Sequence, residues 1–259
     1  MLAERVYKTE GVVLKRSDVG EADKIVTLYT PYLGKIRAVA KGVRRPTSKL
    51  GGHVELFTLT QVLIARGRNL DIITQAETRR SFIEIRDDLR RLSYAYYLAE
   101  LVDRFTEEHI ENTPLYQLLL AALDALHGAR DLDLELRAFE LHLLRLVGYQ
   151  PQLFHCVACG RPLEPVLNAF SAAVGGVLCP GCGLGEPLRR EVSLDALKVL
   201  RFLQSNDFVA FARLRVSPAL NEELEALLGD YIRYLLERNL KSAEFLQTLR
   251  RQEARPSPS

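Results

Sequence analysis

Four cysteines in two closely spaced pairs are the residues of this chain best suited to chemistry. Cys156 and Cys159 form the first pair, Cys179 and Cys182 form the second, and 19 residues separate the pairs. This is the spacing of a four-cysteine zinc site, because two intervening residues let both thiolates of a pair reach one tetrahedral ion. A glycine follows each pair, where positive φ would turn backbone N–H groups toward the sulfurs. The four cysteines are therefore predicted to bind one zinc ion.

Such a site is expected to be structural, because four thiolates leave no coordination position for a substrate. Metal binding would then contribute to the folding of a module at about residues 149–190, where Gly and Pro are dense. A thioredoxin-like redox pair is disfavoured, since no βαβ pattern surrounds the cysteines. An iron–sulfur cluster stays open, because spacing does not distinguish it. His155 is interpreted as a neighbouring or surface group rather than a fifth ligand.

The chain is expected to be cytoplasmic. Residues 1–10 are mixed polar and carry no secretory signal, and the longest apolar stretches, such as 115–126, are too short to span a bilayer. Disulfides rarely persist in a reducing compartment, so the four cysteines are not expected to form two disulfides.

A basic strand and loop form the second chemical feature. Alternation over residues 35–41 puts Lys35, Arg37 and Lys41 on one face and the apolar residues Ile36, Ala38 and Ala40 on the core face. The loop 42–52 adds three cations, Arg44, Arg45 and Lys49, and no acid. Such a stripe suits a groove that tracks a phosphate backbone. The bland alternative is a solvated surface loop. Candidate stacking aromatics are Tyr7, Tyr29, Tyr32 and Phe57, of which Phe57 is the best candidate for the core instead.

Charge is unevenly distributed along the chain. Residues 1–80 hold 15 basic and 8 acidic residues, out of 35 and 33 in the whole chain, so the remainder holds 20 and 25. A basic front part against an acidic remainder indicates that residues 1–80 meet a polyanion. Chance clustering on a solvated surface is the alternative.

The elements that must position these groups fall into two classes. Strand-like runs at 6–15, 24–30, 35–41, 54–66 and 70–76, separated by turn signals, predict a five-stranded barrel over residues 1–80. An OB-fold suits this pattern, and an SH3-like barrel fits it nearly as well. From residue 81 the apolar period becomes helical. Helices are expected at 85–105, 113–128, 133–147, 194–204, 218–239 and 243–251, with Thr113 and Ser217 as N-caps before proline and Gly148 as a C-cap. The fold class is therefore α+β: an OB-fold barrel, then a mostly helical domain at 81–259 with an inserted four-cysteine module.

Catalytic signatures are absent from the sequence. It contains no phosphate-binding loop of either common type, no H-E-x-x-H and no G-x-S-x-G, and its five histidines are scattered. No enzyme is predicted.

Several segments carry a family resemblance. GVVLK at 11–15, GEADKIVTLYT at 20–30, GKI at 34–36, VAKGVRR at 39–45 and LF at 56–57 resemble the bacterial RecO recombination mediator family. The likeness is dense over residues 10–77 and looser over the helical part. Some members of that family lack the cysteines, so the zinc prediction rests on this sequence alone.

The resemblance implies a non-enzymatic DNA repair and recombination protein that uses no nucleotide. It would bind single- and double-stranded DNA, anneal complementary strands and act with RecR to help load RecA onto DNA coated with single-strand binding protein. Phosphate contact is carried over to Lys35, Arg37, Lys41, Arg44 and Arg45, with Lys15, Lys24 and Lys49 extending the track. Some members bind the acidic, apolar tail of single-strand binding protein. Such a site needs a basic rim around an apolar groove, expected in the helical part. Candidate rim residues here are Arg130, Arg137, Arg145, Arg189 and Arg190. No membrane and no small-molecule substrate is expected, and localisation would be at the nucleoid.

Two rival functions remain beside this one. OB barrels and zinc modules also serve RNA, so an RNA-binding or ribosome-associated factor fits the same features. A protein scaffold whose acidic helical part binds a partner is the second rival, and a metal-dependent nuclease is a distant third.

Overall fold

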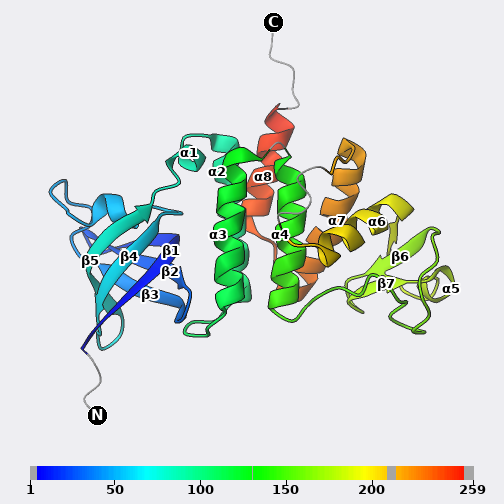
Figure 1. Ribbon diagram of the computed structural model, residues 1–259, viewed down its shortest axis with the longest axis horizontal. Helices are drawn as coiled ribbons and strands as arrows, with labels where there is room; N and C mark the ends of the chain where they lie inside the picture. Colours follow the sequence, from blue (N-terminus) through cyan, green and yellow to red (C-terminus); the bar gives the residue numbers. More distant parts are fainter. Residues whose placement is uncertain (1–4, 130, 209–213, 254–259) are drawn as a thin grey trace, which may run out of the picture. The chain divides into compact units, whose positions relative to one another are not determined.

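The structure is a computed structural model that describes residues 5–129, 131–208 and 214–253. It divides into two compact units, Met1–His127 and Gly128–Ser259 (Figure 1). The first unit therefore extends past the predicted 1–80 domain and includes three helices. None of the helices within the described ranges is both long and apolar enough to cross a membrane.

A closed five-stranded barrel forms the start of the first unit, as predicted. Its strands are β1 (Val6–Val19), β2 (Asp23–Thr30), β3 (Gly34–Ala40), β4 (Leu59–Ala65) and β5 (Asp71–Arg80). They follow one another in the order β1-β2-β3-β5-β4, and β1 closes the barrel by pairing with both β2 and β4. The β3–β5 pair is parallel and the other pairs are antiparallel. This is an OB-like barrel.

The barrel core follows from the alternation of apolar residues along each strand. Inward side chains such as Val26, Ile36 and Ile64 are fully buried. Strand β1 has 14 residues and pairs with both β2 and β4. Its register with β2 shifts between Val13 and Lys15, an irregularity that bends a strand. The sequence pattern identified the strands but not this bend.

The predicted strand over residues 54–66 is wrong in its first part. A 3-10 helix, η1 (Gly51–Val54), precedes a short irregular segment, and β4 begins only at Leu59. Within that segment Phe57 has φ +63°, and its N–H donates to the carbonyl oxygen of Val13 at 2.9 Å. Phe57 is 1 % exposed and its ring meets that of Tyr96 edge to face. The segment therefore leaves the strand conformation, and its Phe57 ring packs against a residue of the helical part that follows the barrel.

Three helices complete the first unit: α1 (Ile83–Arg86), α2 (Leu89–Phe105) and α3 (Thr113–Gly128). The predicted helix over 85–105 is interrupted because Asp88 caps a new helix, accepting the N–H groups of Arg90 and Arg91. The predicted N-cap Thr113 is also wrong. Asn112 accepts the N–H of Leu115, while the Thr113 hydroxyl donates to the carbonyl of Pro31 at 2.6 Å in the β2–β3 turn.

The β2–β3 turn lies against the chain between α2 and α3. Gly34 has φ +59°, and a Cβ there would overlap the carbonyl oxygen of Ile110. The N–H of His109 donates to the carbonyl of Lys35 at 2.9 Å. Only glycine permits both this backbone conformation and this close approach.

The described part of the second unit contains four longer helices and a small sheet. The helices are α4 (Leu132–Leu146), α6 (Leu194–Ser205), α7 (Pro218–Leu236) and α8 (Lys241–Glu253). The predicted cap-then-proline start is confirmed, since the Ser217 hydroxyl accepts the N–H of Leu220. Gly148 has φ +85° just beyond α4, as predicted. The tail after Glu253 and the predicted rim residue Arg130 lie outside the described residues.

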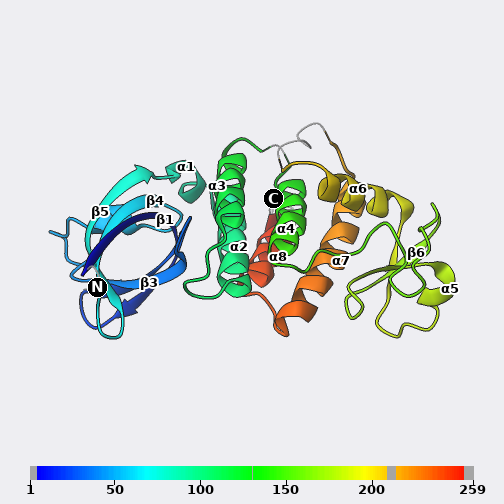
Figure 2. The ribbon, with the colours of Figure 1, turned by 60° about the horizontal axis from the view of Figure 1, so that its bottom comes forward.

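The small sheet comes from the predicted module at 149–190. It contains β6 (Asn168–Ser171), β7 (Gly176–Leu178) and β8 (Arg190–Val192) in the order β7-β6-β8, with α5 (Pro180–Gly183) between β7 and β8. In Figure 2 the sheet and α5 lie at one end of the second unit, beyond α6 and α7. The region is therefore an insertion between helices, as the glycine and proline content indicated.

Candidate metal centre and nucleic-acid interface

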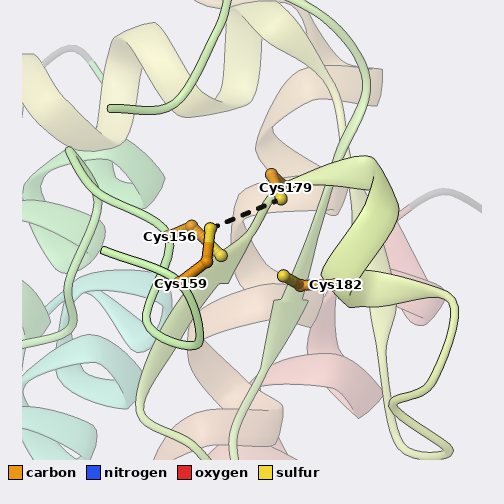
Figure 3. Close-up of side chains that lie close together, drawn as sticks. All are labelled: Cys156, Cys159, Cys179 and Cys182. Carbon is orange, nitrogen blue, oxygen red and sulfur yellow. Dashed lines mark hydrogen bonds between the residues drawn. The ribbon is translucent and has the colours of Figure 1, made fainter. Parts of the chain in front are cut away.

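The four cysteines meet at one point. Their sulfur atoms all lie within 4.8 Å of one another, and Cys159 Sγ is 4.0 Å from Cys179 Sγ across the two pairs (Figure 3). A tetrahedral ion with metal–sulfur bonds of about 2.3 Å sets its sulfurs about 3.8 Å apart. Cys156 is buried, and Cys159 is exposed. The cluster thus has the number and spacing of ligands for one metal ion.

The first pair lies in a tight turn of the chain. The N–H of Gly160 donates to the carbonyl of Cys156 at 2.8 Å, and Gly160 has φ +72° as predicted. The N–H of Cys156 in turn donates to the carbonyl of Arg161 at 2.8 Å. These bonds hold the two cysteine side chains on the same side of the turn.

The second pair lies at the short helix α5. The N–H of Gly183 donates to the carbonyl of Cys179 at 2.8 Å, but Gly183 is helical, so the prediction of positive φ there is wrong. Glycine is needed for another reason, since an added Cβ would lie 2.9 Å from the Cβ of Ala169. The residue packs α5 directly against β6.

Electrostatics around the cluster favour a bound cation. Burial raises the pKa of Cys156, but N–H groups of Cys179, Cys159 and Ala158 outweigh it and lower that pKa overall. The Arg161 guanidinium, with Nε 3.5 Å from Cys159 Sγ, lowers the pKa of Cys159 to about 6. Hydrogen bonding to Cys179 raises the pKa of Cys182 to about 12. The four sulfurs cannot all be thiolates at neutral pH without a positive charge among them, which a divalent metal supplies.

His155 does not join this cluster. Among the residues that the structure describes, only the four cysteines form a group that could hold a metal ion. His155 is exposed, and its backbone N–H donates to the Gln152 side chain at 3.3 Å. This agrees with its interpretation as a surface group.

The predicted alternation along β3 is confirmed at five positions. Ile36, Ala38 and Ala40 are buried in the barrel, while Arg37 and Lys41 are exposed. Across the strands, Lys15 of β1 is opposite Thr27, and Thr27 is opposite Arg37. Residues opposite one another share a face of the sheet, so the register brings Lys15 and Arg37 onto one outer face.

Lys35 departs from this pattern, and its predicted exposure is wrong. The residue is 9 % exposed, and its ammonium donates to the carbonyl oxygen of Asp103 at 2.5 Å and to the Asp103 carboxylate at 3.1 Å. Helix α2 and the segment after it cover this end of β3. Period-two alternation predicts the face of the strand on which a side chain lies. It does not predict whether another element of the fold covers that face.

The basic loop after β3 is held in a defined conformation. The N–H of Gly42 donates to the Asp23 carboxylate at 2.7 Å, and the N–H of Arg44 donates to the carbonyl of Ala22 at 2.9 Å. The loop therefore lies against the β1–β2 turn. Its side chains Arg44, Arg45 and Lys49 are exposed, as predicted.

Acidic partners of the basic residues were missed in the sequence. Asp18 pairs with Lys24 at 2.5 Å and with Arg44 at 3.5 Å, and Lys24 is half-buried. Farther along the barrel, Arg37 lies 3.5 Å from Glu108. The pairing of Asp18 with Lys24 follows from the hairpin register, so a hairpin centred on Gly20 was the available signal. The other cations of the track, Lys15, Lys41, Arg45 and Lys49, have no carboxylate partner among the residues that the structure describes.

The candidate stacking aromatics do not gather on this face. Tyr29 and Phe57 are buried, and the hydroxyl of Tyr7 donates to Asp71 at 2.7 Å. Tyr32 is 70 % exposed in the β2–β3 turn. Phe57 therefore belongs to the core, as expected.

The possible rim arginines are not brought together. Arg137 is buried beside Glu140, with 3.1 Å between their charged groups. Arg190 pairs with Asp230 at 2.6 Å, and Arg145 bonds to His142 at 3.1 Å. Burial of Arg137 removes it from any solvent-exposed rim.

Comparison with known proteins finds matches over most of the chain. Residues 3–82 match the family "Recombination protein O N terminal", and residues 86–244 match "Recombination protein O C terminal". A DNA repair protein RecO from Roseiflexus sp. (strain RS-1) is 47 % identical over 258 residues, covering 100 % of this chain and 91 % of that protein. The DNA repair protein RecO of Symbiobacterium thermophilum is 40 % identical over 95 % of this chain and 98 % of its own length. One from Dehalococcoides mccartyi (strain BAV1) is 39 % identical over 94 % and 96 %. The chain therefore belongs to the RecO family of DNA repair proteins.

Proposed function

We propose that this chain is a non-enzymatic recombination mediator that binds single- and double-stranded DNA through its barrel and anneals complementary strands. With RecR, it helps RecA onto DNA coated with single-strand binding protein. The observation that carries the proposal is the set of exposed cations on the outer face of the OB-like barrel and on the loop that follows β3.

Phosphate contact is assigned to the exposed members of the predicted set: Arg37, Lys41, Arg44, Arg45, Lys15 and Lys49, with the half-buried Lys24 beside them. Each neutralised phosphate releases counterions, so binding weakens as salt rises and depends little on sequence. Annealing is limited by repulsion between two polyanions, and a cationic surface reduces that repulsion. Lys35 is assigned to holding α2 against the barrel, because its ammonium is already bound to Asp103.

The metal of the four-cysteine centre is proposed to be one zinc ion held by Cys156, Cys159, Cys179 and Cys182. Zinc would supply charge neutralisation and a cross-link between two loops, with no position open for substrate. The arrangement that supports it is a closed set of four sulfur ligands within 4.8 Å.

The remaining partners are proposed with family membership as their support. The acidic tail of single-strand binding protein is proposed to bind the helical second unit, where Arg189 is exposed. The protein is proposed to work in the cytoplasm at the nucleoid, without a membrane or a small-molecule substrate.

The test is a variant that lacks four of the assigned cations: Arg37→Ala, Lys41→Ala, Arg44→Ala and Arg45→Ala combined. The matched control removes four exposed cations of the second unit: Lys198, Arg233, Arg238 and Lys241. Both variants lose four positive charges, so a difference in their DNA affinity shows that the position of the removed cations matters. On single-stranded DNA the salt slope of the barrel variant is expected to fall by about 0.7 for each lost contact. Equal affinity of the two variants would contradict the assigned face.

The rival functions give different results in the same assay. An RNA-binding protein would prefer RNA when DNA and RNA oligonucleotides of matched sequence compete. A scaffold would bind neither in a salt-dependent way. A nuclease would cleave labelled DNA in the presence of a divalent metal.

A further inference from the structure

The four sulfurs of the cysteine cluster differ in how much protein surrounds them. Cys156 is buried, Cys179 and Cys182 are half-buried, and Cys159 is exposed. A dipositive ion held by four thiolates leaves the centre with a net negative charge. An exposed thiolate of such a centre is the ligand that a chelator or an electrophile reaches first. Cys159 is therefore the ligand whose surroundings decide how easily the metal is lost.

One cation, Arg161, lies against this exposed sulfur. Its Nε–H donates to Cys159 Sγ, with 3.5 Å between nitrogen and sulfur. The backbone holds Arg161 in place, because the N–H of Cys156 donates to its carbonyl at 2.8 Å. The neighbouring residues His155 and Pro162 form an antiparallel bridge. The tight turn around the first cysteine pair thus brings the chain back so that the guanidinium contacts Cys159.

The other arginines of the 149–192 region are bound elsewhere. Arg190 pairs with Asp230 at 2.6 Å. Arg189 donates to two backbone carbonyls of the turn that follows α5, at 3.3 and 3.2 Å. Arg161 has no carboxylate partner among the residues that the structure describes. Its positive charge is therefore available to the sulfurs alone.

We infer that Arg161 is a positioning residue of the metal centre, which acts through Cys159 and slows the loss of the metal. Groups that hydrogen-bond to metal ligands change metal affinity by about 10–100-fold. Arg161 is exposed, so water screens its charge and its effect lies at the low end of that range. This inference rests on the proposed zinc centre and adds to it the residue that sets how long the metal stays bound.

The experiment compares two substitutions of this residue in the full chain. Arg161→Met removes the charge and the donors and keeps an unbranched side chain, whereas Arg161→Lys keeps the charge on a compact ammonium. The matched control is Arg238→Met, an exposed arginine outside the region that donates to the carbonyl of Leu236 at 3.4 Å. Each protein is loaded with zinc, and transfer of the zinc to a chromophoric chelator is timed. A second preparation of each is loaded with cobalt(II), whose sulfur-to-metal charge-transfer band reports the electron donation of the thiolates.

Arg161→Met is expected to release zinc about tenfold faster than the original chain. Arg161→Lys should stay within about threefold of the original chain because its charge remains, and Arg238→Met should not differ from it. The cobalt band of Arg161→Met should move to lower energy, since a thiolate without its hydrogen bond donates electrons to the metal more readily. Thermal unfolding of the zinc-loaded proteins verifies the fold. Arg161→Gln, with the same expectation, serves if Arg161→Met is not folded.

Limited alkylation of the zinc-loaded chain tests the position of the effect. Iodoacetamide forms a carbon–sulfur bond with a thiolate and iodide leaves, and peptide mapping identifies the cysteine that carries the new group. In Arg161→Met, Cys159 is expected to be modified first and about tenfold faster than in the original chain, because it loses its hydrogen bond and its cover. First modification at a cysteine of the second pair would overturn the assignment to Cys159.

Two further results would overturn the inference. The first is zinc release by folded Arg161→Met at the rate of the original chain. The second is faster release with an unmoved cobalt band, because the side chain would then support the turn and not the sulfur. If the original chain binds neither zinc nor cobalt, the proposed metal centre itself fails, a result that the original chain reveals without any variant.

Discussion

The ammonium of Lys35 lies 2.5 Å from the carbonyl oxygen of Asp103 and 3.1 Å from its carboxylate. Lys35 is the second residue of β3 and Asp103 lies near the end of α2, so one buried cation joins the barrel to the helix that covers it. Its neighbours on the strand, Arg37 and Lys41, carry the same charge and are exposed. We therefore propose two different tasks for the cations of this segment: Lys35 holds α2, and Arg37 and Lys41 contact DNA.

Separate substitutions should resolve these two tasks. Lys35→Ala leaves the Asp103 carboxylate without its cation and is expected to lower the free energy of unfolding by about 1–3 kcal/mol. The DNA affinity of the folded variant should stay close to that of the original chain. Lys41→Ala should show the reverse, with weaker DNA binding and little change in stability. Denaturant unfolding and oligonucleotide titration of both variants check this, and strong loss of DNA affinity in folded Lys35→Ala would contradict it.

Asp18 is expected to restrain DNA binding. Its carboxylate pairs with Lys24 at 2.5 Å and with Arg44 at 3.5 Å, next to the basic loop. Asp18→Asn removes one negative charge and releases both cations, so affinity for DNA should rise by a few fold at low salt. The matched control is Glu77→Gln, which frees Arg79, its partner at 3.1 Å on β5. If both variants gain equally, the effect is one of net charge alone, and the position of Asp18 has no special role.

Metal removal should unfold one part of the chain. A chelator, or Cys156→Ser, is expected to remove one zinc ion and to disorder the 149–192 region, because the ion would link the two cysteine pairs of this small module. DNA binding by the barrel should persist. Elemental analysis and hydrogen exchange measure these effects, and His155→Ala, which changes a residue outside the cluster, should keep its zinc. A coloured protein with absorption in the visible range would instead indicate an iron–sulfur cluster.

Stability should depend on pH through Glu135. Burial, aided by the nearby Asp131 carboxylate, raises the pKa of Glu135 to about 7 from an ordinary value of 4.5. Between these values the folded chain holds a proton that the unfolded chain has released, so stability falls as pH rises through this window. Glu135→Gln should remove that loss and be more stable at pH 8 by about 1–2 kcal/mol, after allowance for solvent screening. Thermal unfolding from pH 4 to pH 8 checks this against the exposed control Glu222→Gln; parallel curves would contradict it.

Local patterns predicted the parts of the molecule that depend on nearby residues. The five strands, the cap at Ser217 and the clustering of the cysteines all follow from spacings of a few residues or from one pairing rule. The cysteine cluster was predictable because metal geometry fixes the spacing of its ligands.

Features that depend on distant contacts were not predictable in this way. The burial of Lys35 needs Asp103, 68 residues away, and the irregular conformation of Phe57 needs the backbone of Val13. Asn112, and not the predicted Thr113, caps helix α3, because the hydroxyl of Thr113 donates to the carbonyl of Pro31 instead. In each case a tertiary partner competed with a local preference and won.

Annealing of two complementary oligonucleotides, each precoated with single-strand binding protein, tests the central claim most directly. The pure, zinc-loaded chain is added without nucleotide at several salt concentrations. Our account predicts that annealing accelerates, that the acceleration fades as salt rises, and that the Arg37/Lys41/Arg44/Arg45 alanine variant loses most of it while its charge-matched control keeps it. No acceleration by the folded original chain, or equal acceleration by both variants, would contradict it.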